Sequence, residues 1–113
     1  FFGPAQSGFT ATYTYSLDEQ SVHLAHILTV AGEKGAKRIE ASEAAEKAWV
    51  QTIIEKARLT ADFQEKCTPG YYNNEGKGNA KPQNNMYGGG PIEFFSLMKK
   101  WRSKGNLKGL ELS

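Results

Sequence analysis

Residues 67–90 most constrain how this chain can fold, because they hold six of the 12 glycines and five asparagines but few aliphatic side chains. A stretch of this length without apolar periodicity is uncommon in a compact domain, where long loops are usually functional or disordered. Tyr71 and Tyr72 lie within the stretch and favour an ordered loop, because aromatic rings tend to pack against other surfaces.

The chain before this loop predicts a strand and then a helix. Apolar or aromatic residues alternate with threonines over residues 9–15, which favours a strand. Ser16 and Glu19 have the spacing of a capping box, which predicts a helix starting at Ser16, and Gly35 is placed to end it. The apolar stripe expected to be buried on this helix consists of Val22, Leu24, Ala25, His26, Ile27, Leu28, Thr29 and Ala31.

A short strand and a second helix follow. The alternation over residues 37–41 predicts a strand with Ile39 facing inward, and Ser42 is a typical N-cap. The helix is expected from Glu43 to about Leu59, with Trp49 anchoring the packing between helices.

The chain after the loop predicts one more helix and a closing strand. Pro91 suits the first position of a helix, and Gly105 suits its C-terminal cap. Residues 107–112 alternate and are expected to pair with the strand around Ile39. The core face of this helix is expected to comprise Phe94, Leu97, Met98 and Trp101.

Composition limits the function classes. A chain of 113 residues with 39% hydrophobic and 23% charged residues is typical of one soluble domain. It has no apolar run long enough to span a membrane and no signal peptide, and Cys67 is its only cysteine, so a cytoplasmic location is expected. A net charge of +2, spread evenly, gives no reason to expect a nucleic-acid partner. The start at Phe1 without a methionine indicates a piece of a longer protein.

Few residues form a constellation that could carry chemistry. His23 and His26 are three residues apart on a predicted helix, but no third ligand stands at a fixed spacing. The expectation is therefore no metal, with one histidine at the core edge and the other in solvent, and no acid-base pair. In residues 67–77, tyrosines, asparagines and Lys77 suit a nucleotide cofactor or a neighbouring domain. The alternative is that the tyrosines only hold the loop on the core.

Several motifs resemble the C-terminal end of flavin-dependent Baeyer-Villiger monooxygenases, especially a fungal-type branch. They are CTPGYYNNEG at residues 67–76, GPIEFF at 90–95, and the closing WR and GLEL at 101–102 and 109–112. FGPAQSGFT at residues 2–10 and DEQ at 18–20 also look like that family. The resemblance implies an enzyme that uses FAD, NADPH and dioxygen to insert one oxygen atom beside a ketone carbonyl, giving an ester or lactone.

The family's dinucleotide fingerprint GxGxxG and its FxGxxxHxxxWP motif are absent from these residues. The isolated chain is therefore expected to bind no cofactor and to be inactive, with no catalytic residue of its own. Its implied partners are a ketone substrate and the FAD and NADPH domains of the parent enzyme, and exposed apolar surface at Phe1, Phe2 and Phe9 would favour self-association.

The resemblance also assigns site residues by position. Ser7, Gly8, Phe9 and Thr10 would border the ketone pocket, and Tyr13 would lie near the flavin ring. The loop around Thr68 would close over NADPH. Many relatives have a tryptophan at about the position of Thr68, so Tyr71 or Tyr72 is expected to take its place. The family is also largely irregular over residues 9–15, which weakens the strand prediction there.

The expected fold class is α+β: about three helices, a small two-stranded sheet and a long ordered loop, within the FAD-binding region of a flavoprotein with two dinucleotide-binding domains. Residues 1–113 are expected to form a single unit. It comprises a pocket-lining segment (1–15), a helix-strand-helix (16–59), the long loop (60–90), and a helix with a final strand (91–113). The alternative is a free-standing small helical binding module that uses the aromatic loop at residues 67–77.

Overall fold

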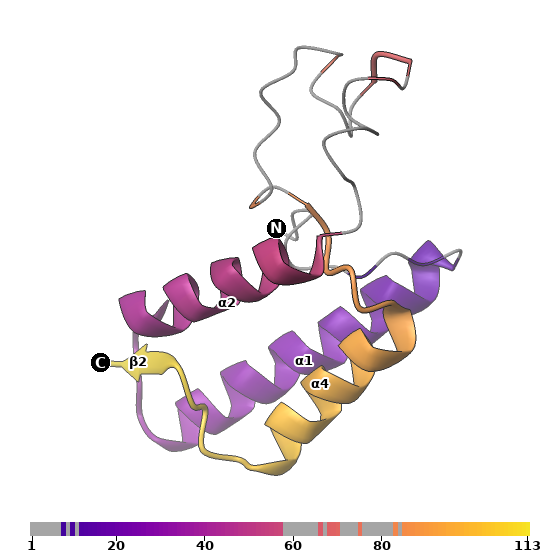
Figure 1. Cartoon of the computed structure of the whole chain (residues 1–113). Coiled ribbons are helices and arrows are strands. Elements are labelled where there is room, and N and C mark those ends of the chain that lie inside the picture. The colour runs from indigo at the N-terminus through magenta and orange to yellow at the C-terminus, as the bar shows by residue number, and fades with distance from the viewer. Residues whose placement is uncertain are drawn as a thin grey trace.

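The computed structural model describes residues 8, 10, 12–57, 66, 68–70, 75, 83 and 85–113. In this part of the chain, three helices and a two-stranded sheet follow in the order α1 (Tyr13–Glu33), β1 (Ile39–Ala41), α2 (Glu43–Lys56), α4 (Pro91–Ser103) and β2 (Leu110–Leu112) (Figure 1). The α+β prediction of helices with a small sheet is confirmed. The long loop falls largely outside the described residues.

The start of α1 differs from the prediction. The helix begins at Tyr13, so the strand predicted over residues 9–15 is wrong where the structure describes it, and Ser16 lies inside the helix instead of capping it. The helical turn lets the Tyr15 hydroxyl donate to Glu19 Oε1 at 3.2 Å, a contact that a strand would not allow. Glu19 also faces cations of α4, so it does not reach back to the Ser16 amide.

Local signals located the other boundaries. Gly35 has a φ of 71°, and the Ala36 N–H donates to the Ala31 carbonyl at 3.0 Å, which closes the end of α1. Ser42 Oγ accepts from the Ala45 N–H at 3.3 Å and starts α2. Pro91 is the first residue of α4, as predicted. The end of α2 at Lys56 comes before the expected Leu59.

The two short strands form the predicted antiparallel sheet. Ile39 pairs with Leu112, Glu40 with Glu111, and Ala41 with Leu110. Bonds beyond the strands extend the pairing, since Ser113 exchanges backbone hydrogen bonds with Arg38 at 2.7 and 3.1 Å. The sheet therefore ties the C-terminus to the turn between α1 and α2.

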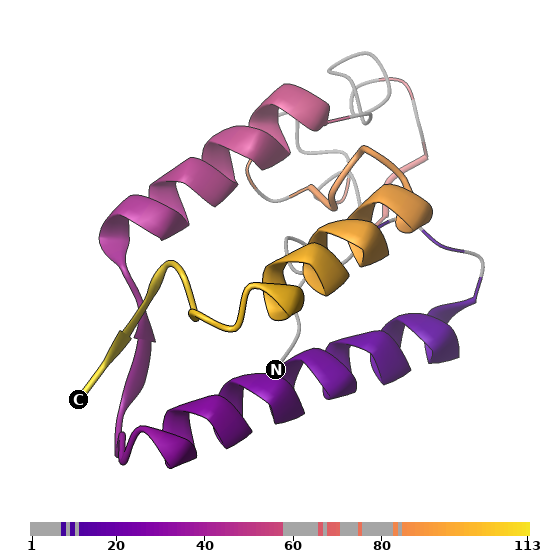
Figure 2. The same cartoon turned by 90° about the horizontal axis from the view of Figure 1, so that it is seen from below.

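The core lies where α4 meets α2. Figure 2 shows α4 between α1 and α2. The buried core cluster consists of Ile53, Tyr87, Phe94, Phe95 and Met98, with the partly buried Trp49 packed against it. The Trp49 ring stacks on Tyr87, with centroids 5.6 Å apart, and also contacts Phe94, which confirms Trp49 as an anchor between helices. Leu97, predicted for the core face, is exposed.

The buried face of α1 is mostly polar, contrary to the prediction. Ser16, Glu19 and Gln20 are buried, and of the expected apolar stripe Ala31 is buried as predicted, while Leu24 and Leu28 are 45% and 55% exposed. Periodicity identifies an apolar flank but does not say which neighbour covers it. Within the described chain α4 covers the polar flank instead, because its cations pair with Glu19.

Candidate functional site

The structure brings two of the predicted substrate-pocket residues to the start of α4. Gly8 forms a parallel bridge with Tyr87, and a Cβ at Gly8 would lie 3.1 Å from Phe94 Cβ, so the chain passes directly over α4 there. Thr10 lines a pocket next to this crossing. Ser7 and Phe9, predicted for the same pocket, lie outside the described residues.

The pocket at Thr10, here called the threonine pocket, has a volume of about 660 Å³. It lies between the segment leading into α1 and the outer side of α4. Its polar wall comprises Thr10, Thr12, Ser96, Lys99 and Lys100, and its apolar wall comprises Tyr15, Pro91, Ile92 and Phe95. Three hydroxyls and two cations beside an apolar wall suit a ligand with oxygen acceptors on an apolar body.

Two contacts hold the walls of the threonine pocket in place. The Tyr15 ring meets Phe95 edge to face with centroids 5.1 Å apart, which joins α1 to α4. The Thr12 N–H donates to Thr10 Oγ1 at 3.2 Å, so the predicted pocket residue also orders the entry to α1. Tyr15 and Phe95 were not predicted as site residues: Tyr15 lies in no motif, and the motif that contains Phe95 supported the family resemblance without assigning Phe95 a role.

An ion cluster behind the pocket fixes the position of Lys99. Glu19 Oε1 lies 3.2 Å from Lys99 Nζ, and Glu19 Oε2 lies 3.2 Å from Arg102 Nη2. Burial alone would raise the pKa of the Glu19 carboxyl, but hydrogen bonds from Lys99, Arg102 and Tyr15 outweigh it and hold the pKa below its ordinary value. The hydrogen bond to Glu19 raises the pKa of Lys99 in turn, so Lys99 stays a cation and a donor.

The predicted cofactor residues are only partly described. Tyr13, expected near the flavin ring, is the first residue of α1 and is 64% exposed, so its ring is accessible from solvent. Thr68, expected to face NADPH, is exposed, and the Glu75 N–H donates to the Gly70 carbonyl at 2.9 Å within the same loop. Tyr71 and Tyr72 lie outside the described residues.

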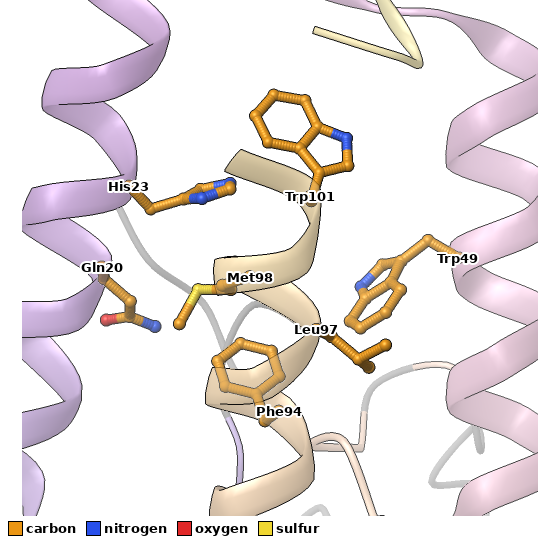
Figure 3. Close-up of a pocket in the computed structure, with 7 residues that line it drawn as sticks. All are labelled: Gln20, His23, Trp49, Phe94, Leu97, Met98 and Trp101. Atoms are coloured by element: carbon orange, nitrogen blue, oxygen red, sulfur yellow. The ribbon is translucent and has the colours of Figure 1, made fainter. Parts of the chain in front are cut away.

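A second pocket, here called the apolar pocket, lies between the three helices and has a volume of about 400 Å³ (Figure 3). Gln20 and His23 project into it from α1 and Trp49 from α2. The α4 side is formed by Phe94, Leu97, Met98 and Trp101. Gln20 and His23 on the α1 wall would orient an apolar molecule bound in this pocket.

The two histidines of α1 both lie against Trp101 of α4. The His23 and His26 rings lie 5.0 and 6.3 Å from the Trp101 ring centroid, and both are half-buried, so the expectation of one histidine in solvent is wrong. Burial, together with the charges of Arg102 and His26, lowers the pKa of His23. In the described part of the chain, no three metal-ligating side chains gather around one point.

A third cluster, missed by the sequence analysis, links α2 to α4. Lys56 Nζ lies 2.6 Å from Glu93 Oε1, and the Tyr87 hydroxyl donates to the same oxygen. Burial and the hydrogen bond to Glu93 raise the pKa of Tyr87. A Cβ at Gly89 would lie 2.5 Å from Tyr87 Cε1, so only glycine leaves room for this arrangement. Because Lys56 lies 37 residues before Glu93 in the sequence, no local spacing predicts this cluster.

Comparison with known proteins identifies the class. Pentalenolactone D synthase of Streptomyces exfoliatus is 48% identical over 108 residues, which cover 95% of this chain and 18% of that protein. The Baeyer-Villiger monooxygenase of Streptomyces coelicolor is 39% identical over 102 residues, covering 90% of this chain and 17% of that protein. No protein-family model matches the chain.

The fold agrees with the sequence comparison. The polycyclic ketone monooxygenase from the fungus Thermothelomyces thermophila superposes with a TM-score of 0.78 at 27% identity, over 96% of this chain and 18% of that one. The chain is thus related in sequence and fold to FAD-binding monooxygenases. More narrowly, it is a relative of the Baeyer-Villiger monooxygenases, as its motifs predict, and it spans about 18% of the length of the curated relatives it matches.

Proposed function

We propose that this chain is part of a cytoplasmic Baeyer-Villiger monooxygenase that uses FAD and NADPH to convert a ketone into an ester or lactone. In this proposal it packs beside the FAD-binding domain of an enzyme with two dinucleotide-binding domains. The observation that carries the proposal is the match in sequence and fold over nearly the whole chain, and the presence of Thr10 in the lining of a pocket is consistent with it.

In this proposal the threonine pocket contributes one wall of the ketone site. Thr10 and its neighbour Thr12 present hydroxyls that can donate to a carbonyl oxygen, while Phe95 and Ile92 contact the apolar body of the ketone. Ser7 and Phe9, which flank Gly8 in the sequence, are assigned to the same site by the family resemblance alone. Residues of this chain bind and orient the ketone, and the acid-base and redox chemistry belongs to the rest of the enzyme.

The side chains present fit a flavin next to this wall. The exposed Tyr13 ring can lie against a flat ring system, and Lys99 and Lys100 can bind anionic or carbonyl oxygens. When bound and reduced, the flavin supplies the reaction with dioxygen that provides the inserted oxygen atom. The chain's part is to hold the ketone near that ring and to exclude water with its apolar wall.

The loop at residues 67–77 is proposed to meet NADPH. Thr68 is exposed and so is accessible to a ligand, and the Glu75 N–H donates to the Gly70 carbonyl nearby in the sequence. Tyr71 or Tyr72 would then supply the flat surface that a nucleotide ring needs.

A chimeric enzyme tests the proposal. The matched 108 residues of pentalenolactone D synthase from S. exfoliatus are replaced by the corresponding residues of this chain. We expect the purified chimera to retain FAD, to oxidise NADPH in a ketone-dependent manner and to form an oxygenated product. A chimera that folds and retains FAD but oxygenates no ketone accepted by the relative would contradict the proposal.

A further inference from the structure

The outward side of α1 is apolar in the described structure. Leu24 and Leu28 are 45% and 55% exposed, and Leu17 and Val22 are exposed as well. Leu17, Leu24 and Leu28 lie on one flank of the helix, because their spacing of seven and four residues returns to nearly the same direction. Figure 2 shows α4 along one side of α1, and no helix or strand of the described chain covers the opposite side.

This outward side also carries almost no charge. From Gln20 to Gly32, α1 has no Asp, Glu, Lys or Arg. On the outward side of α2, by contrast, Glu43, Glu46 and Lys47 are exposed. A helix face that stays in water normally resembles that of α2, because charged side chains keep it soluble. The outward side of α1 therefore has the composition of a covered surface.

We propose that this side of α1 is an interface on which the remaining polypeptide of the monooxygenase packs, an inference that rests on the proposed function. The relatives are several times longer than this chain, which covers 18% of pentalenolactone D synthase, so a large partner is available in the same polypeptide. Ser21 and Ala25 lie between the leucine flank and Val22, and such small side chains let another layer of structure approach closely.

A membrane surface fits this side of α1 less well. Helices that lie on membranes usually carry Lys or Arg next to the apolar face, where the cations meet anionic lipids. From Tyr13 to Glu33 the helix has neither residue. In the described part of the chain, no helix is long and apolar enough to cross a membrane.

Cysteine labelling tests the interface. Leu24→Cys and Leu28→Cys are made separately, in a background where Cys67 is serine, both in the isolated chain and in the chimera with pentalenolactone D synthase. Modification by a soluble thiol reagent is followed at each site by mass spectrometry. The matched control is Ile54→Cys on α2, because Ile54 is 38% exposed and lies on a different helix.

We expect both α1 cysteines to react about 10-fold or more slowly in the chimera than in the isolated chain, since a buried thiol is protected, while the control reacts at similar rates in both. Equal rates in both proteins would overturn the interface. Protection in the isolated chain that grows with its concentration would assign the surface to a second copy and also overturn the proposal. Labelling needs no turnover, so an inactive chimera with protected cysteines would count against the proposed function alone.

Discussion

At the residue scale, Thr10 is the predicted site residue for which the structure gives the most information. Its hydroxyl lines the threonine pocket and also accepts the Thr12 amide, so it links the pocket wall to the start of α1. Gly8 is next to it at the crossing over α4. The sequence predicted these positions by resemblance. The sequence did not predict that Phe95 and Lys99 form the opposite wall of the pocket, because their helix lies more than 80 residues further along the chain.

Thr10→Val in the chimera tests the role of this hydroxyl. We expect kcat/KM for the ketone to fall about 5-fold, because one hydrogen bond to an uncharged acceptor contributes about 1 kcal/mol, while the FAD content stays unchanged. Steady-state kinetics measure the effect. Thr14→Val is the control, because Thr14 is exposed on α1 and does not line the pocket. An equal loss in both variants would remove Thr10 from the site.

The lowered pKa of Glu19 predicts that the fold loses stability in acid. Its pKa in the folded chain lies below the ordinary value of 4.5, so the stabilisation is present above pH 4.5 and is lost as the pH falls through the lowered value. His23 lowers the stability of the fold at a higher pH than Glu19 does. Its pKa in the folded chain lies below 6.5, so its protonation opposes folding as the pH falls under 6.5.

The variant Glu19→Gln separates the contribution of Glu19 to the pH dependence of stability from that of His23. At neutral pH we expect a loss of about 2 kcal/mol in the free energy of unfolding, since charge-assisted hydrogen bonds to two cations are removed. The loss of stability below pH 4.5 should become shallower, while the part near pH 6 remains. Urea titrations across pH measure this, with the exposed Glu46→Gln as control. An unchanged pH profile would show that the cluster contributes no stability.

At the element scale, the sequence located those boundaries that depend on local chemistry. Ser42, Gly35 and Pro91 act through their own backbone or one neighbouring turn, so their patterns could be interpreted directly. The capping box predicted at Ser16 did not form, because Glu19 pairs with Lys99 and Arg102 of a distant helix instead of bonding to the Ser16 amide. The prediction of which residues of α1 are buried failed for a related reason. Leu24 and Leu28 form an apolar flank, but none of the described helices or strands covers it.

Ser42→Ala tests the start of α2. Removing the hydroxyl that accepts the Ala45 N–H should lower the free energy of unfolding by about 1 kcal/mol. The control is Ser21→Ala on α1, where the hydroxyl bonds back to the Leu17 carbonyl and alanine is expected to be neutral or slightly stabilising. Denaturant unfolding followed by circular dichroism compares them. No difference between the two variants would exclude Ser42 as a stabilising cap.

At the scale of the whole molecule, the described residues form three helices and a two-stranded sheet around one small core, and α1 exposes apolar side chains on a side with little charge. A free-standing binding module would be expected to carry charges there, as α2 does. The low charge on the outward side of α1 supports a role inside a larger flavoprotein, together with the match to 18% of the relatives' length.

The isolated 113-residue chain is predicted to bind no FAD. It contributes one wall to the proposed site and lacks the GxGxxG turn that would bind the pyrophosphate. Equilibrium dialysis against FAD, followed by visible absorbance of the chain, measures this. A yellow preparation of the isolated chain that oxidises NADPH would be incompatible with this division of roles.

The most direct measurement for the central claim is the fate of isotopically labelled dioxygen in the chimera with pentalenolactone D synthase. If this chain is a working segment of a Baeyer-Villiger monooxygenase, the ester or lactone product will carry one labelled oxygen atom, and its formation will require both NADPH and the ketone. A folded, FAD-containing chimera that consumes NADPH and dioxygen but leaves the label out of the organic product would contradict the account.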